Sequence, residues 1–212
     1  MLALPLCLCT ATRAHAGTAG GEILCNQTTA GNQAGFGRNS VAMDGNGNFV
    51  VVWTSEESTT SDIYARLYNN DGTPQAGQFI VNTSISGAQG NPAVAMNASG
   101  QFVIAWESPD ASGSGISARI FNAGGTPTGN DFAVNTITTY SQFFPAVAID
   151  ASGNCVCAWA GYVDDGGGGF DTDIFFQRFN GAGTKQGSQT WVNTVAYIGD
   201  QLSPAVAMSS GG

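Results

Sequence analysis

The feature that most constrains this chain is a repeat of about 53 residues. Trp53, Trp106 and Trp159 stand 53 residues apart. A proline recurs with them at Pro92, Pro145 and Pro204, and a Val-Asn-Thr triplet recurs at Asn82, Asn135 and Asn193. Their second spacings are longer, because the third copy contains six additional residues. A chain with such internal similarity folds as supersecondary units that bury their apolar surfaces against one another.

Each copy contains four short apolar runs, which in the first copy lie at residues 41–43, at 49–53, at 63–69 and before Asn82. Gly, Asn, Asp and Ser separate the runs, which is typical of strands and turns rather than helices. The first turn of each copy carries a glycine that tolerates a positive φ. These turn glycines are Gly47, Gly100 and Gly153. The sequence therefore predicts an all-β fold.

Four short strands and one tryptophan per unit favour a β-propeller-like array of four-stranded blades. Tandem small β-sandwiches are the alternative, although a four-stranded unit has little core of its own. The predicted complete units span residues 39–91, 92–144 and 145–203, with a preceding strand at 22–27 and a partial unit at 204–212. Known propellers close with roughly four to eight blades. We therefore expect an incomplete propeller whose partners are other copies of itself or the rest of a longer chain.

The N-terminal residues differ from the repeat. The apolar run Leu2–Cys9 precedes Ala14-His15-Ala16, a small-x-small cleavage pattern. We interpret residues 1–16 as a signal peptide and 17–212 as the repeat domain, which predicts a secreted or cell-surface protein. A buried N-terminal strand is the alternative. No later run reaches the roughly 20 apolar residues of a membrane span.

Charge and composition exclude several functions. The chain has 15 acidic and 6 basic residues and a formal net charge of −9, which argues against nucleic acid and anionic membrane surfaces as partners. Cleavage after Ala16 would remove His15, the sole histidine, and with it Ser-His-Asp, Cys-His and histidine–metal chemistry. We therefore expect a chain that is not an enzyme.

Acidic loop residues are the remaining candidates for catalysis. Glu56, Glu57, Glu107 and Asp110 follow the tryptophan strands and could form the carboxylate pair of a glycosidase. None of them recurs as a motif, so solvated loop acids are the preferred interpretation.

An insertion in the third copy offers a metal-site candidate. It places Asp164, Asp165, Asp171 and Asp173 on either side of a glycine run. Four carboxylates on a flexible segment could bind calcium, although the spacing is not that of an EF-hand. A solvated loop is the alternative, and no other cofactor is expected.

Recurring positions explain the remaining notable residues. Cys25, Cys155 and Cys157 match apolar residues of other copies, so buried free thiols are expected rather than a metal or redox site. The three tryptophans end apolar strands and are interpreted as buried anchors, with sugar stacking as the alternative. Arg66 and Arg119 recur on the third strand and predict hydrogen bonds between blades or at the surface.

The repeat pattern P-x-V-A-M-D-x-x-G-x-F-V-V-x-W, followed by I-x-A-R-x-[YF]-N-x-x-G-x-P and F-x-V-N-T, covers residues 21–212. It resembles tandem propeller-like repeats of large secreted bacterial surface proteins of the adhesin type. The resemblance implies a non-enzymatic extracellular module with a structural, adhesive or self-assembly role. A carbohydrate-binding, lectin-like propeller that recognises surface glycans is the alternative, and a glycoside hydrolase of propeller fold is a weaker one.

Overall fold

The computed structural model describes residues 22–28, 31–34, 39–56, 60–164, 166, 168–193 and 199–212. The predicted signal peptide, residues 1–16, lies outside this part of the chain. All regular secondary structure in the described residues is β-strand, as the all-β prediction requires. No described segment forms a helix long and apolar enough to cross a membrane.

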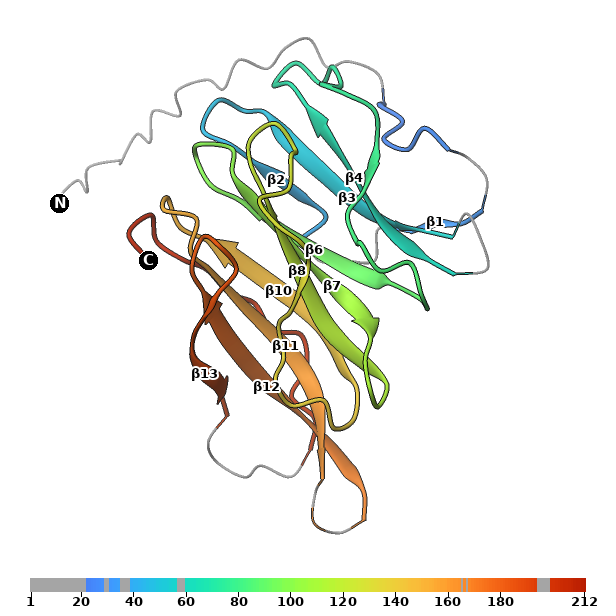
Figure 1. Cartoon of the computed structure of the whole chain (residues 1–212), viewed down its shortest axis with the longest axis vertical. Helices are drawn as coiled ribbons and strands as arrows, with labels where there is room; N and C mark the ends of the chain where they lie inside the picture. Colours follow the sequence, from blue (N-terminus) through green and yellow to red (C-terminus); the bar gives the residue numbers. More distant parts are fainter. Residues whose placement is uncertain are drawn as a thin grey trace, which may run out of the picture.

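The strands form three antiparallel sheets that follow one another along the chain (Figure 1). The first sheet contains β1 (Gln33–Ala34), β2 (Val41–Met43), β3 (Phe49–Ser55), β4 (Asp62–Tyr68) and β5 (Phe79–Ile80). The second contains β6 (Gly90–Met96), β7 (Phe102–Pro109), β8 (Ser114–Phe121) and β9 (Phe132–Ala133). The third contains β10 (Gln142–Ile149), β11 (Cys155–Asp164), β12 (Phe170–Phe179) and β13 (Lys185–Trp191). Each sheet therefore corresponds to one copy of the repeat.

The first sheet has the same plan as the other two. Its strands β1 and β2 both pair with β3, and together they occupy the edge that β6 occupies on β7. β1 and β2 are thus two pieces of one interrupted first strand. Counted in this way, each of the three sheets has four strands.

The first strands of the second and third sheets begin earlier than the repeat boundaries at Pro92 and Pro145. Their pairing is irregular between Gly90 and Ala93 and between Phe143 and Ala146. Proline has no N–H to give to a β-ladder, so it is tolerated where the ladder is interrupted. Pro92 and Pro145, which mark the predicted starts of the second and third units, therefore lie inside β6 and β10 rather than before them.

The recurring asparagines end the fourth strands by side-chain hydrogen bonds. The Oδ1 atom of Asn82 accepts a bond of 2.8 Å from the backbone N of Ile63, and Asn135 accepts the same bond from Ile116. Asn193 accepts from Ile174 at 3.0 Å in the third sheet. A side chain thus replaces the next rung of the ladder, so the described fourth strands stop before the Val-Asn pair.

The two predicted end strands are not strands in the structure. Neither Ile23–Asn26 nor Val206–Met208 pairs with a strand among the described residues. A β-strand requires a ladder of backbone bonds with a neighbour. Instead, the carbonyl of Cys25 accepts bonds from side chains, and the tail after Met208 meets a turn through a bond from Ala151 N to Ser210 O.

The core lies in two layers, one between each pair of neighbouring sheets. In both layers, one face of a sheet packs on the opposite face of the next. Trp53 is 5% exposed, and Trp106 and Trp159 are fully buried. The repeat thus places one large aromatic anchor at the same position in each sheet.

The turn glycines occupy left-handed backbone. The φ angles of Gly47, Gly100 and Gly153 are +85°, +84° and +82°. Residues with a Cβ rarely adopt this conformation, so the recurring glycine permits the tight turn between the first and second strands.

Candidate functional site

The longest hairpin of the molecule borders the candidate site. The β11–β12 ladder continues to the pair of Asp164 and Phe170, well past the end of the corresponding β7–β8 ladder in repeat register. The insertion predicted as a loop is therefore largely a strand extension. Tyr162, Val163 and Phe170 supply the aromatic and β-branched side chains that favour strands.

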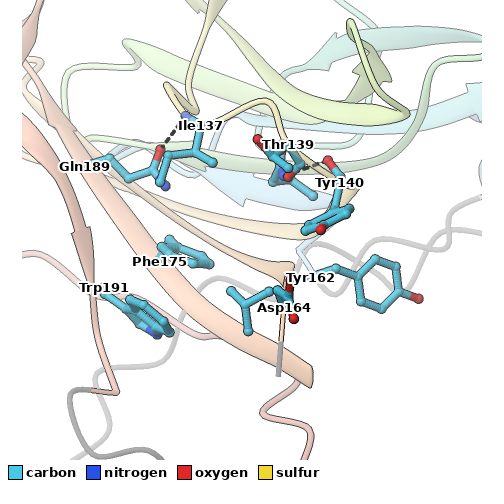
Figure 2. A pocket seen from close by; sticks show the side chains of 10 residues that line it. Ile137, Thr139, Tyr140, Tyr162, Asp164, Phe175, Gln189 and Trp191 are labelled. Atoms are coloured by element: carbon cyan, nitrogen blue, oxygen red, sulfur yellow. Dashed lines mark hydrogen bonds between the residues drawn. The ribbon is translucent and has the colours of Figure 1, made fainter. Parts of the chain in front are cut away.

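A pocket of about 280 Å³ lies beside this hairpin, on the third sheet (Figure 2). It is formed by the end of β11, by β12 and β13, and by the segment that joins the second sheet to the third. Its lining consists of Ile137, Thr139, Tyr140, Gln142, Tyr162, Val163, Asp164, Phe175, Gln189 and Trp191. Four of these ten residues are aromatic.

The aromatic side chains form a floor and a rim. Phe175 is 6% exposed, whereas Trp191 is 49% exposed, and their ring centroids lie 5.6 Å apart. In Figure 2, both rings lie across the cavity from Tyr140 and Ile137. An accessible tryptophan beside a buried phenylalanine offers a flat apolar surface to a ligand.

Tyr140 is held in an unusual backbone conformation. Its φ angle is +62°, a region that costs a non-glycine residue roughly 1–3 kcal/mol. Its ring meets Phe170 edge-on at 4.6 Å, and Gln142 Nε2 donates to the carbonyls of Tyr140 and Thr139 at 2.8 and 3.1 Å. These contacts fix the ring at the pocket wall.

Gln189 and Asp164 add polar groups to the lining. The Oε1 atom of Gln189 accepts bonds from the backbone N atoms of Thr136 and Ile137 at 2.8 and 3.3 Å. This fixes the amide at the pocket edge. Asp164 is exposed and accepts a bond of 2.8 Å from Gly166 N. It is the one carboxylate among the ten lining residues.

The second sheet has a pocket at the equivalent place, and it is smaller and more polar. Its volume is about 190 Å³, and it contains Ser84, Ser86, Gln89 and Ser117. In repeat register, Tyr140, Tyr162, Phe175 and Trp191 replace Gly87, Pro109, Ser117 and Ala133. The third copy therefore has an aromatic lining that the second copy lacks. Of these four positions, that of Phe175 is aromatic in the first copy as well, where Tyr64 stacks on Trp53 as Phe175 stacks on Trp159.

A buried donor lies next to the pocket wall. Trp106 Nε1 donates to Gln89 Oε1 at 3.0 Å. The matching pair in the third sheet is not formed, because Gln142 Oε1 accepts from Asn135 Nδ2 at 2.8 Å, and the indole N–H of Trp159 has no partner among the described residues. The third copy thus departs from the repeat at this contact too.

The predicted calcium ligands do not converge in the described part of the hairpin. Asp164 lies opposite Phe170, and Asp171 lies opposite Val163, so the two carboxylates leave opposite faces of the ladder. Asp173 accepts a hydrogen bond from the amide of Asn193 and is buried. No group of three metal-ligating side chains occurs among the described residues, and Asp165 lies outside them, so the calcium site stays a prediction.

The loop acids proposed as catalytic candidates make local hydrogen bonds. Glu107 Oε1 accepts from Asn91 Nδ2 and from Phe144 N, both at 2.8 Å, and so ties the first strands of the second and third sheets together. Glu56 accepts a bond of 2.8 Å from Asn32 Nδ2, which lies before β1, and Asp110 accepts one of 3.0 Å from Ser112 N in its own loop. Glu57 lies outside the described residues.

The arginines and two of the three cysteines have the structural roles expected from their positions, whereas Cys25, which was expected to be a buried thiol, is only partly buried. Cys155 and Cys157 are buried free thiols in the core. Burial raises the pKa of Cys155 to about 12, and that of Cys157 is also raised. Arg119 Nη1 donates to the carbonyl of Val81 in the preceding sheet at 2.9 Å, and Arg66 Nη1 donates to Cys25 at 3.2 Å. The prediction of hydrogen bonds between neighbouring units is confirmed for Arg119.

No protein-family model and no curated protein matches the chain. Among solved structures, a protein of unknown function from Dyadobacter fermentans matches with a TM-score of 0.51 and 11% identity, over 75% of this chain and 56% of that one. An alpha-L-arabinanase from Penicillium chrysogenum, solved with arabinobiose, matches with a TM-score of 0.48 and 14% identity, over 69% and 45% of the two chains. An alpha-L-arabinofuranosidase from Lactobacillus brevis gives 0.44 and 11%, over 70% and 52%. The chain thus spans about half the length of these proteins.

These matches correct the leading functional interpretation from the sequence. The arabinanase and the arabinofuranosidase are glycoside hydrolases, not structural or adhesive modules. A non-enzymatic structural, adhesive or self-assembly role is therefore wrong as the first interpretation.

Proposed function

We propose that the third-sheet pocket binds a neutral carbohydrate and that the chain belongs to a glycan-directed protein. One observation carries this proposal. The third copy has aromatic residues where the second copy has Gly87, Pro109, Ser117 and Ala133, and it keeps Tyr140 in a left-handed conformation at the position of Gly87. A strained residue that a repeat elsewhere avoids is expected at a binding site.

The chemistry of the lining suits a sugar. Sugar rings present apolar C–H faces that pack on aromatic rings, while their hydroxyl groups need hydrogen-bonding partners. Trp191 and Tyr140 supply the apolar surfaces, and Gln189 and Asp164 supply polar groups. The volume of about 280 Å³ lies near the lower end for ligand pockets, which suits one or two sugar units.

The charge of the site favours a neutral ligand. None of the ten lining residues is cationic, and the chain has a formal net charge of −9. Anionic glycans need positive groups to offset their desolvation and repulsion. Neutral pentose or hexose oligosaccharides are therefore the proposed class.

We infer that the three sheets are consecutive blades of a propeller. Neighbouring sheets pack face to face in the same way twice, and the first strand β6 lies against both β2 and β10. Secretion through the predicted leader would bring such a protein to extracellular glycans, and this location belongs to the proposal.

Hydrolysis of the bound glycan is the second candidate function. The observation that favours it is Asp164, whose carboxylate stands at the pocket that the aromatic residues form. Glycosidases use two carboxyl groups about 5–9 Å apart, as acid and as nucleophile or base. Asp164 would supply one of them.

Calorimetric titration with arabino-, xylo- and cello-oligosaccharides tests binding. We expect saturable binding of at least one series and a loss of tenfold or more in Trp191→Ala, because an aromatic face contributes roughly 1.5–3 kcal/mol when buried. Phe144→Ala, which removes an exposed aromatic ring outside the pocket, is the control and should bind as the wild type does. Absence of binding to every series would refute the proposal.

An assay of reducing-end release from the same oligosaccharides tests hydrolysis. The expected result is turnover by the wild-type chain that Asp164→Asn abolishes while binding is retained. Binding without turnover would leave recognition as the function and reject the second candidate.

A further inference from the structure

The smaller pocket, on the second sheet, lies where one residue departs from the repeat. In the first and third sheets, the residue paired with the repeated tryptophan is an aromatic ring that stacks on it, with 6.1 Å between ring centroids. These stacked pairs are Trp53 with Tyr64 and Trp159 with Phe175. In the second sheet, Ser117 is paired with Trp106. Serine fills far less space than a ring, and the cavity of about 190 Å³ lies at this place.

Both pockets adjoin the layers in which two sheets pack on each other. Trp106, at the base of the second-sheet pocket, belongs to the core between the first and second sheets. Phe175, in the lining of the third-sheet pocket, belongs to the core between the second and third sheets. Each pocket is also bounded by the segment that joins its two sheets. The pockets are therefore equivalent features of two successive interfaces.

The two pockets lie one repeat apart, at the same end of their sheets. Asp131 lines the second-sheet pocket, and Gln189 lines the third-sheet pocket at the same position of the repeat. Asp131 Oδ2 accepts a bond of 2.9 Å from Thr83 N, just as Gln189 Oε1 accepts one of 2.8 Å from Thr136 N. Stacked sheets lie roughly 10 Å apart, so we expect the two pockets to be separated by a distance of that order.

One segment of the chain connects the two pockets. It begins at Ala133 of β9, which lines the second-sheet pocket, and continues to Ile137 and Tyr140, which line the third-sheet pocket (Figure 2). Thr136 and Ile137 are exposed along it. A ligand that lies over this segment would contact both pockets.

The lining of the second-sheet pocket suits hydroxyl groups. Ser108 Oγ and Ser117 Oγ lie 2.7 Å apart and form one hydrogen bond, which uses one of their two hydroxyl hydrogens. The carboxylate of Asp131 can accept further bonds, and bonds to a charged acceptor are stronger than those to a neutral one. None of the ten lining residues is cationic. Because sugar hydroxyls both donate and accept, this set of groups complements a neutral sugar.

We propose that the second-sheet pocket is a second subsite for the glycan of the third-sheet pocket, and that the ligand is an oligosaccharide long enough to reach both. This inference rests on the proposed function. The aromatic pocket packs on the face of one sugar ring, and the hydroxyl-lined pocket binds the hydroxyls of a unit farther along the same chain. Two linked contacts bind more tightly than either alone, because the second forms at a high effective concentration.

Calorimetric titration with arabino-, xylo- and cello-oligosaccharides of increasing length, from disaccharide to hexasaccharide, tests the second subsite. Within the series that binds, the wild-type affinity is expected to rise about tenfold or more at the length that first reaches the second-sheet pocket. Ser117→Phe fills that pocket with the ring that the third copy has at this position. It is expected to bind short members as the wild type does and to lose the gain with length. Trp191→Ala, in contrast, should weaken binding at every length.

A matched control and a second variant make the result decisive. Ser152→Phe adds the same ring at an exposed serine in the turn between β10 and β11, at the other end of the third sheet, and should keep the gain. Circular dichroism must show that Ser117→Phe is folded. If it is not, Ser86→Phe, at an exposed residue of the pocket lining, replaces it.

The outcomes separate this inference from the proposed function. An affinity that stays constant with chain length, or a gain that the filled pocket retains, would overturn the second subsite while the third-sheet pocket still binds short oligosaccharides. Absence of binding at every length would refute the proposed function and the second subsite with it.

Discussion

Tyr140 illustrates how one residue can depart from its repeat. The equivalent residue in the second copy is Gly87, with a φ of +76°, and Gly199 takes the matching position after the third sheet, with a φ of +117°. Gln142 and Gln201 donate to the carbonyls at 140 and 199, so the turn itself recurs. The backbone therefore demands glycine at this position, and the tyrosine has been placed there at a cost in conformational energy.

Replacement of Tyr140 tests this strain directly. Glycine is expected to be more stable than alanine by roughly 1–2 kcal/mol at this position, because alanine retains the left-handed penalty. Both variants lose the ring and should lose carbohydrate affinity to a similar extent. Urea unfolding compares their stabilities, and an alanine variant as stable as the glycine variant would contradict the assignment of strain.

The strand β11 shows that cysteines can occupy apolar core positions of the repeat. Cys155 and Cys157 lie on the face that packs on the second sheet, where the matching residues are Phe102 and Ile104. Neither sulfur has a metal-binding or disulfide partner among the described residues. The strand uses the thiols as small apolar side chains, which burial makes hard to ionise.

Thiol labelling of β11 follows from this burial. The pKa of Cys155 is raised from 9.0 to about 12, so the folded chain holds a neutral thiol while the unfolded chain ionises above pH 9. Ionisation of the thiol therefore favours the unfolded chain between pH 9 and pH 12. The free energy of unfolding keeps its full value below pH 9 and falls as the pH rises toward 12. The peptide that contains both cysteines is expected to resist iodoacetamide at pH 8 and to react fully in urea, as mass spectrometry would show. Rapid labelling of the native chain would contradict the assigned burial.

At the scale of the whole molecule, stability depends on contacts between sheets. The second sheet is covered on both faces, whereas the first and third are each covered by a sheet on one face. The contribution of an apolar residue to the free energy of unfolding therefore depends on which copy contains it, even when the repeat position is the same.

Ile116 and Ile174 form a matched pair for this effect. Ile116 is 1% exposed in the layer between the second and third sheets, and Ile174 lines an open groove on the third sheet. Ile116→Ala is expected to lower the free energy of unfolding by roughly 2–5 kcal/mol. Ile174→Ala should cost less than half as much, because Ile174 is only partly buried and lines the groove. Equal costs in urea unfolding would contradict the partial exposure of Ile174.

The 53-residue period was sufficient to predict the four-strand plan of each sheet and the order of its strands, but it also predicted two end strands that do not form. Local spacing specifies the strands, because alternation of apolar residues and turn glycines acts over a few residues. The strand extension past Trp159 was missed, because glycines and aspartates at 164–173 suggested a loop while the flanking tyrosine and phenylalanine decided the outcome. The pocket was missed as well, because its lining comes from the segment after Asn135 and from all four strands of the third sheet.

By itself, the sequence determined the repeat, the all-β class, the buried tryptophans and the apolar environment of Cys155 and Cys157, since each follows from residue type at a recurring position. Only the tertiary structure decided which aromatic residues share a pocket, which face of each sheet is covered and that Val206–Met208 is not a strand. Those outcomes depend on neighbours distant in sequence, and a period shared by all copies does not specify them.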